Sequence, residues 1–204
     1  MNFTRQLMNR LRIKAAAGMQ FSNGRPDMVR AISQRWLLNL WKRSLGAAKI
    51  PLWQMAESED LSRIRDSLSF FDVAGAVPHD RYVIRFNGPT IARVYSRTDC
   101  RGQSLDQIIP AHHYEFARAP YRQAVASGCP VYTVHDVVDI NQRIVHFERL
   151  LLPFSSGGET VDRIMASFEF VCADGAFVSD GLLRGQTQRP ELKLSATIAR
   201  HAMA

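Results

Sequence analysis

Two stretches decide the fold of this chain: IVHFERLLLPF at residues 144–154 and VDRIMASFEFV at residues 161–171. Both are rich in β-branched, aromatic and aliphatic residues, and the intervening SSGGET supplies the small residues that a connection between strands needs. We therefore predict a long β-hairpin. In the second stretch, apolar and polar side chains alternate, which indicates one buried face and one face that is wet or paired.

The first stretch of this hairpin has two competing registers. One register turns Val145, Phe147 and Leu151 inward, and the other turns the even-numbered residues from 144 to 152 inward. The first register places Arg149 on the inner side of the strand, and the second register places Glu148 there. A charge facing the core needs a partner, so we expect either an internal ion pair, an exposed face, or an anionic ligand held by Arg149.

Working outward from the hairpin, further strands are predicted at 68–74, 82–87 and 131–138. A helical block lies between the second and third of these strands, and its longest helix is predicted over 112–127 with Gly128 as its cap. Two strands, a helical block and three strands predict an α+β domain: a five-stranded antiparallel sheet with helices on one face.

Before the first strand, an amphipathic helix is predicted from Asp27 to Gly46. Its apolar positions, among them Trp36 and Trp41, recur at three- and four-residue steps. Two tryptophans on one helix need a large surface to cover them. This surface is either the domain's own sheet or a second copy of the chain, and the second reading predicts a homodimer.

The positive charge of the chain is concentrated near its start. The net charge is +7, yet residues 1–49 hold 10 Lys or Arg and one acid, Asp27, whereas the other 155 residues hold 16 Lys or Arg and 18 acids. A domain that binds nucleic acid carries its basic stripe on the folded face. We therefore expect a solvated basic arm over residues 1–26 and no nucleic-acid partner; contact with an anionic membrane surface is the alternative.

Cysteine usage and hydropathy bear on the cellular compartment. Cys100, Cys129 and Cys172 are widely spaced and odd in number, which argues against a disulfide framework and against a CxxC metal site. No apolar run approaches the roughly 18 residues that span a bilayer. These features predict a cytoplasmic protein without a membrane span.

Four segments together resemble the PAS-domain proteins of bacteria, and specifically a small stand-alone PAS family. They are RYVIRFNGPTIARVYSR at 81–97, DCRGQSLDQIIP at 99–110, YRQAVASGCPV at 121–131 and ERLLLPFSSGGETVDRIMA at 148–166. The resemblance covers residues 35–172. It divides the chain into a basic arm (1–26), a helical extension (27–66), a PAS-like core (67–172) and a C-terminal tail (173–204).

The resemblance implies a small pocket between the sheet and its helices, and a role in sensing or regulation rather than catalysis. Aromatic hydroxyls and one guanidinium among apolar walls are the groups that orient a small ligand. The residues expected to converge on this pocket are Tyr82, Ile84, Phe86, Tyr95, Tyr114, Phe147 and Arg149.

The sequence has only weak motifs for the cofactors that PAS domains are known to bind. Some PAS domains hold haem through a histidine on the long helix, where His113 is the candidate here. The Asn-Cys-Arg-Phe motif of photoactive flavin PAS domains is missing, so covalent flavin photochemistry is not expected. His135 and His146 could be cross-strand neighbours, but two ligands are too few for zinc.

Three function classes stay open. The first is a sensory domain that binds a small molecule or a protein partner and signals through another chain, since only a tail follows Val171. The second is an interaction adaptor whose core is filled. The third is a small cone-shaped isomerase or hydrolase with a polar site made of Tyr95, Asp106 and His113.

Overall fold

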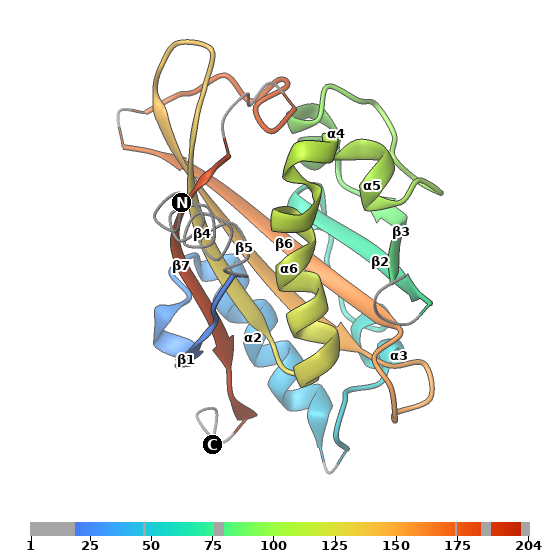
Figure 1. The fold of residues 1–204 in the computed structure, drawn as a ribbon. Helices are drawn as coiled ribbons and strands as arrows, with labels where there is room; N and C mark the ends of the chain where they lie inside the picture. Colours follow the sequence, from blue (N-terminus) through green and yellow to red (C-terminus); the bar gives the residue numbers. More distant parts are fainter. Residues whose placement is uncertain (1–18, 47, 76–79, 174, 185–188, 201–204) are drawn as a thin grey trace, which may run out of the picture.

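A computed structural model describes residues 19–46, 48–75, 80–173, 175–184 and 189–200 (Figure 1). Most of the predicted basic arm therefore lies outside the described residues. The strands are β1 (Ser22–Gly24), β2 (Leu68–Ala74), β3 (Arg81–Asn87), β4 (Val131–Val138), β5 (Ile144–Phe154), β6 (Arg163–Cys172) and β7 (Glu191–Ile198). The helices are α2 (Ile32–Leu45), α3 (Trp53–Glu57), α4 (Pro89–Val94), α5 (Leu105–Ile108) and α6 (Ala111–Ser127), with 3-10 turns at Pro26–Met28 and Arg65–Ser67.

The strands form one seven-stranded sheet in the order β1-β7-β4-β5-β6-β2-β3. All described pairs are antiparallel except β1 with β7, which is parallel. The α+β class is confirmed, but the prediction of five antiparallel strands is wrong. The additional strands come from the two flanks: β1 from the predicted arm and β7 from the predicted tail.

Helices cover both faces of this sheet, not one. Figure 1 shows α6 in front of the sheet, with α4 and α5 beside it, and α2 behind the sheet. Each face has its own hydrophobic core. One core, which we call the α6 face, includes Phe71, Tyr121 and Leu151, and the other, which we call the α2 face, includes Trp41 and Leu150.

The predicted β5–β6 hairpin is confirmed and lies at the centre of the sheet. Phe147 pairs with Phe170 and Leu151 pairs with Ala166, so these apolar side chains share the α6 face. The two competing registers of β5 are both buried, because each face has a covering helix. Arg149 consequently lies on the α6 face and Glu148 on the α2 face, each about 5% exposed.

Helix α2 packs against the sheet of its own chain. Trp41 is fully buried, and its indole Nε1 donates a hydrogen bond of 2.6 Å to the carbonyl of Pro153 in β5. Trp36 is 38% exposed. Burial of Trp41 in its own domain removes that residue from any surface between copies, so a dimer contact through this helix would rest on Trp36 and its exposed neighbours.

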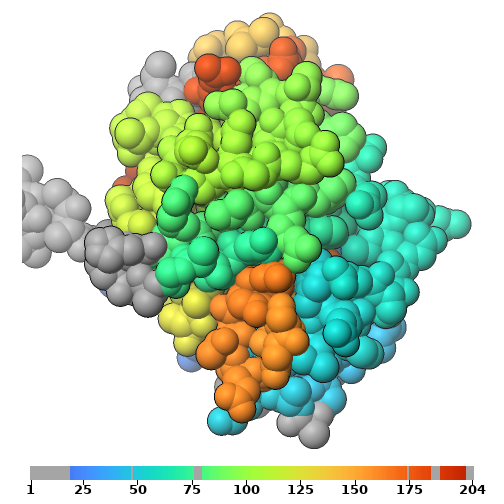
Figure 2. Space-filling model, turned by 90° about the vertical axis from the view of Figure 1, so that its right-hand side faces the viewer, coloured from blue at the N-terminus to red at the C-terminus, as the bar shows by residue number. Residues whose placement is uncertain are grey.

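The connection between β5 and β6 is tied to the helical extension. Leu52 bridges to Ser155, and the Trp53 amide donates to the Ser155 carbonyl at 2.8 Å. Figure 2 shows this connection in orange beside the extension in cyan, below the helical block in green. The extension and the core therefore share one packed structure.

A bulge in β3 changes the face of one predicted pocket residue. Phe71 pairs with Ile84 whereas Phe70 pairs with Phe86, which leaves Arg85 as the additional residue on β3. An additional residue breaks the two-residue period, so side chains beyond it point to the other face. Phe86 therefore packs on the α2 face, and the prediction that it shares a side with Tyr82 and Ile84 is wrong.

Two glycines fix the ends of the helical block. Gly128 has φ 59°, the left-handed conformation that ends a helix, and its amide donates to the Ala124 carbonyl at 3.0 Å. Gly88 precedes α4, and a Cβ there would lie 2.2 Å from the Asp66 carbonyl oxygen. No larger residue fits that approach of backbone to backbone.

Candidate functional site

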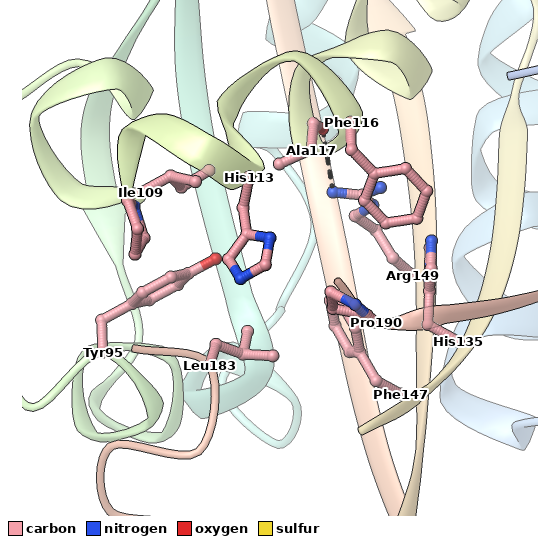
Figure 3. A pocket seen from close by; sticks show the side chains of 11 residues that line it. Tyr95, Ile109, His113, Phe116, Ala117, His135, Phe147, Arg149, Leu183 and Pro190 are labelled. Atoms are coloured by element: carbon pink, nitrogen blue, oxygen red, sulfur yellow. Dashed lines mark hydrogen bonds between the residues drawn. The ribbon is translucent and has the colours of Figure 1, made fainter. Parts of the chain in front are cut away.

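A cavity of about 50 Å³ lies between the start of α6 and the strands β4 and β5 (Figure 3). Its apolar walls include Ile109, Phe116, Phe147, Leu183 and Pro190. Four polar side chains also line it: Tyr95, His113, His135 and Arg149. A cavity with mainly apolar walls and a few polar groups is the usual form of a small-molecule site.

Arg149 projects from β5 toward α6. Its Nη1 donates to the Ala117 carbonyl at 3.3 Å, shown as a dashed line in Figure 3, and its guanidinium lies 5.3 Å from the centre of the Tyr121 ring. Its Nε is buried without a hydrogen-bond partner, and within the described residues Arg149 has no ion-pair partner. Neither the carbonyl nor the aromatic ring is an anion, so these two contacts do not neutralise the positive charge of Arg149.

The neighbouring strand β4 adds two buried polar residues on the same face. His135 pairs with Phe147, and Thr133 pairs with Arg149. His135 is 1% exposed, and neither of its ring nitrogens has a hydrogen-bond partner among the described residues; the same holds for the hydroxyl of Thr133. Buried polar atoms are almost always hydrogen-bonded in native proteins. The cavity is thus lined by three such atoms, the two ring nitrogens of His135 and Nε of Arg149, which have no partner among the described residues.

His135 is neutral in this environment. Burial lowers its pKa to about 3, and the positive charges of Arg149 and Arg189 act in the same direction. A neutral imidazole keeps one donor and one acceptor nitrogen. His135 can therefore both give and accept a hydrogen bond at physiological pH.

Tyr95 and His113 form the opposite side of the cavity. Tyr95 directly follows α4, and His113 lies in the first turn of α6, 6% exposed. Figure 3 shows the Tyr95 hydroxyl pointing toward the His113 ring. Burial, followed by the neighbouring Tyr121, raises the pKa of the Tyr95 phenol, so the hydroxyl keeps its proton and can donate it in a hydrogen bond.

A different group of charges beside the helical block is fully paired. Asp80 is 5% exposed and accepts hydrogen bonds from Arg122 at 2.7 Å and from the Tyr82 hydroxyl at 2.8 Å. Burial alone would raise its pKa, but the bonds from Arg122 and Tyr82 hold that pKa below the ordinary value. This cluster is a satisfied ion pair with a structural role.

The structure brings together some of the predicted pocket residues and separates others. Tyr95, Phe147 and Arg149 line the cavity, as does the haem candidate His113. Tyr82 is directed to Asp80, and Ile84 lies at a separate void of about 10 Å³.

Three other predicted positions lie away from the cavity. Tyr114 packs under Arg118, 4.8 Å from ring centre to guanidinium, and does not line the cavity. Phe86 is on the other face, and Asp106 of the alternative enzyme site is exposed.

Sequence reasoning missed His135, Phe116, Leu183 and Pro190. The strand period of β4 placed His135 on one face but could not say which face would meet α6. His146, its suggested cross-strand neighbour, pairs with Asp136 on the α2 side, where Nδ1 and Oδ1 are 2.6 Å apart. Leu183 reaches the cavity because its amide donates to the Val94 carbonyl at 2.9 Å, a contact of the predicted tail that has no local signal.

Large cofactors do not fit the residues present. Sites for drug-sized ligands measure roughly 300–1,000 Å³, far more than the cavity beside His113. The void that Cys100 lines is about 10 Å³, which is room for about one water molecule. This arrangement therefore has no space for a haem macrocycle at His113 or for a flavin ring at Cys100.

Metal-binding clusters and membrane-spanning helices are two further features that could indicate a function. The described residues contain no cluster of three or more His, Cys, Asp or Glu side chains arranged to hold a metal ion. Nor does that part of the chain include a helix with the length and apolarity to cross a membrane.

Comparison with known proteins finds similarity in the central part of the chain. A family model described as "PAS fold" matches residues 72–170. Among solved structures, a crystal structure of a Rhodobacter sphaeroides LOV protein is 18% identical with a TM-score of 0.39, over 53% of this chain and 60% of that one. A variant of RsLOV is 17% identical with a TM-score of 0.37, over 54% of this chain and 65% of that one.

The chain thus spans less than two thirds of either of these two proteins. No curated protein matches. The family match runs from within β2 to within β6 and includes the helical block, and all residues that line the cavity except Leu183 and Pro190 lie in it. Residues 72–170 of this chain are therefore similar to the PAS family.

Proposed function

We propose that this protein is a sensory or regulatory PAS domain that binds a small molecule in the cavity beneath α6 and passes its presence to a protein partner. The PAS fold supports a signalling role. The observation that carries the binding proposal is that two residues lining the cavity, His135 and Arg149, have buried polar atoms without a partner among the described residues. A core that served packing alone would leave few such atoms.

The proposed signal passes through α6. This helix contributes His113, Phe116 and Ala117 to the cavity, and it contacts β4, β5 and β7. A ligand that draws Arg149 away from the Ala117 carbonyl would change the hydrogen bonding of this helix. A ligand shifts such an equilibrium only by its difference in affinity for the two arrangements.

A metabolite screen tests this proposal. Thermal unfolding of the intact protein is followed with a library of small metabolites, and native mass spectrometry detects any molecule retained during purification. A compound present at a hundredfold excess over its Kd stabilises the protein by about 2.7 kcal/mol, which is visible as a rise in Tm. A library without a single compound that shifts Tm contradicts ligand sensing.

One observation favours a second candidate, an interaction adaptor. The cavity is small, and most of the surrounding core is filled. In that case the surface carries the function, and the exposed apolar residues Ile32 (79%) and Trp36 (38%) on α2 are the candidate contact, including contact with a second copy. Light scattering at increasing concentration tests this pairing; a protein that stays monomeric at high concentration would exclude it.

A further inference from the structure

The first step concerns charge. Arg149 is 5% exposed, and no Asp or Glu is found among the described residues that line its cavity. Another positive charge on this side is Arg189, whose guanidinium lies 3.9 Å from the centre of the Phe116 ring and which acts on His135. Glu148, adjacent in the chain, points to the α2 face and accepts its hydrogen bond from Tyr132. The cavity therefore carries positive charge that the described residues leave uncompensated.

The second step concerns hydrogen-bond geometry. The Ala117 carbonyl occupies Nη1 of Arg149, whereas Nε has no partner. The edge of a guanidinium that contains Nε can donate two parallel bonds to the two oxygens of a carboxylate. His135 lies near Arg149 in Figure 3 and has two unpartnered ring nitrogens, one of which carries a proton in the neutral ring. A planar anion with two oxygens matches this arrangement of donors.

The third step concerns size and polarity. A volume of about 50 Å³ holds about three to five non-hydrogen atoms. Ile109 and Leu183 lie across the cavity from Arg149 in Figure 3, so the end away from the charge offers an apolar surface beside Tyr95 and His113. A dianion would bring a second charge that one buried guanidinium cannot balance, and burying an unbalanced charge is costly.

We infer that the cavity binds a short-chain monocarboxylate, with the carboxylate on Arg149 and His135 and the alkyl end against Ile109 and Leu183. This inference rests on the proposed ligand-sensing function and names its ligand class. Arg149 supplies the charge and the side-on donors. His135 supplies one additional donor.

The experiment compares an anion with its neutral counterpart. Intact protein, dialysed into a buffer free of carboxylates, is titrated with formate, acetate, propionate and acetamide, and binding is followed by two-dimensional amide NMR and by calorimetry. We expect saturable binding of acetate or propionate, with shifts at His135 and Arg149. Acetamide should bind at least about 30-fold more weakly, because it cannot pair with a buried guanidinium charge.

Variants locate the site. Arg149→Met should weaken binding at least about 30-fold, and His135→Leu about tenfold. Arg85→Met, on the exposed side of β3, removes the same charge away from the cavity and should leave the affinity unchanged. Arg149→Lys keeps the charge without the side-on donors, so it should still lose most of the affinity, and it replaces Arg149→Met if that variant does not fold.

Each alternative result has a distinct meaning. Acetamide binding as tightly as acetate would overturn the assignment to an anion and leave ligand sensing in place. Equal affinity in the wild type and in both Arg149 variants would overturn the site. Failure of all three carboxylates to bind would overturn the inference, and the metabolite screen would then decide separately whether another molecule is sensed.

Discussion

Glu148 and Arg149 are neighbours in β5, and the two faces of the sheet treat them differently. Both side chains are about 5% exposed. Glu148 accepts a hydrogen bond of 2.6 Å from the Tyr132 hydroxyl, beneath α2. Arg149 meets a carbonyl, an aromatic ring and a cavity beneath α6. On the α2 face, Glu148 receives a hydrogen bond from Tyr132. On the α6 face, the Nε donor of Arg149 has no acceptor among the described residues.

This difference teaches what each face does. On the α2 face, Gln34 is fully buried; its Nε2 donates to the Ser167 carbonyl at 3.2 Å, whereas its Oε1 has no partner among the described residues. The bond to Ser167 joins α2 to β6. On the α6 face, Thr133, His135 and Arg149 also retain unpartnered atoms, and His135 and Arg149 line a cavity. A polar group that packing does not satisfy is available to a ligand.

The largest expected loss of stability comes from weakening the packing of α2 on the sheet. Trp41→Ala should lower the free energy of unfolding by about 3–5 kcal/mol, because it removes a fully buried indole and its bond to the Pro153 carbonyl. Urea denaturation of the two proteins measures the difference.

Trp36 provides the matched control on the same helix. Since it is 38% exposed, Trp36→Ala should change stability by about 0.5 kcal/mol or little more. Equal losses for the two variants would show that α2 does not use Trp41 to cover the sheet, and the comparison of the two faces would lose its basis.

A second variant removes only the donor that satisfies Glu148. Tyr132→Phe should destabilise the protein by about 2–3 kcal/mol, because hydrogen bonds to buried charges are worth more than neutral ones. Tyr82→Phe is the control: Asp80 keeps its bonds to Arg122, so the loss there should be about 1 kcal/mol.

Denaturant titration of both tyrosine variants, with their circular dichroism spectra as a check on the fold, gives these values. A loss below about 0.5 kcal/mol for Tyr132→Phe would mean that Glu148 does not depend on that hydroxyl, contrary to the 2.6 Å contact. Adding Glu148→Leu to Tyr132→Phe should recover much of the loss, since an apolar pair needs no hydrogen bond.

Over the range from about pH 7 to 5, the smallest effect is a pH dependence on the α6 face. The pKa of His135 is about 3 in the folded protein and about 6.5 in an unfolded chain, so the unfolded state takes up a proton that the folded state refuses. Stability from this group is complete above about pH 6.5 and declines as the pH falls toward 3, by at most about 1.4 kcal/mol per pH unit.

His135→Leu should remove this slope. Unfolding free energies of the wild type and the variant, measured from about pH 7 to 5 in carboxylate-free buffer, isolate His135 from the carboxyl groups that titrate lower. His135→Gln, which keeps a polar side chain but does not titrate, controls for changed packing. Parallel curves for the wild type and both variants would show that His135 is not held neutral by burial.

The sequence determined the central hairpin, because alternation with a period of two is a local property of the chain. The same period placed Glu148 and Arg149 on opposite faces, and Gly128 marked the end of α6 through its own backbone freedom. Phe147 and Arg149 could be named as cavity residues because they share the α6 side of a recognisable strand.

Only the tertiary structure decided what covers each face. The bulge at Arg85 moved Phe86 across the sheet, and β7 joined the sheet through pairing with β4, a contact between residues far apart in the chain. Whether a buried charge finds a partner likewise depends on the element packed over it. Tyr132 reaches Glu148 and no carboxylate reaches Arg149 within the described residues, and this outcome of long-range packing is what distinguishes a structural charge from a candidate binding site.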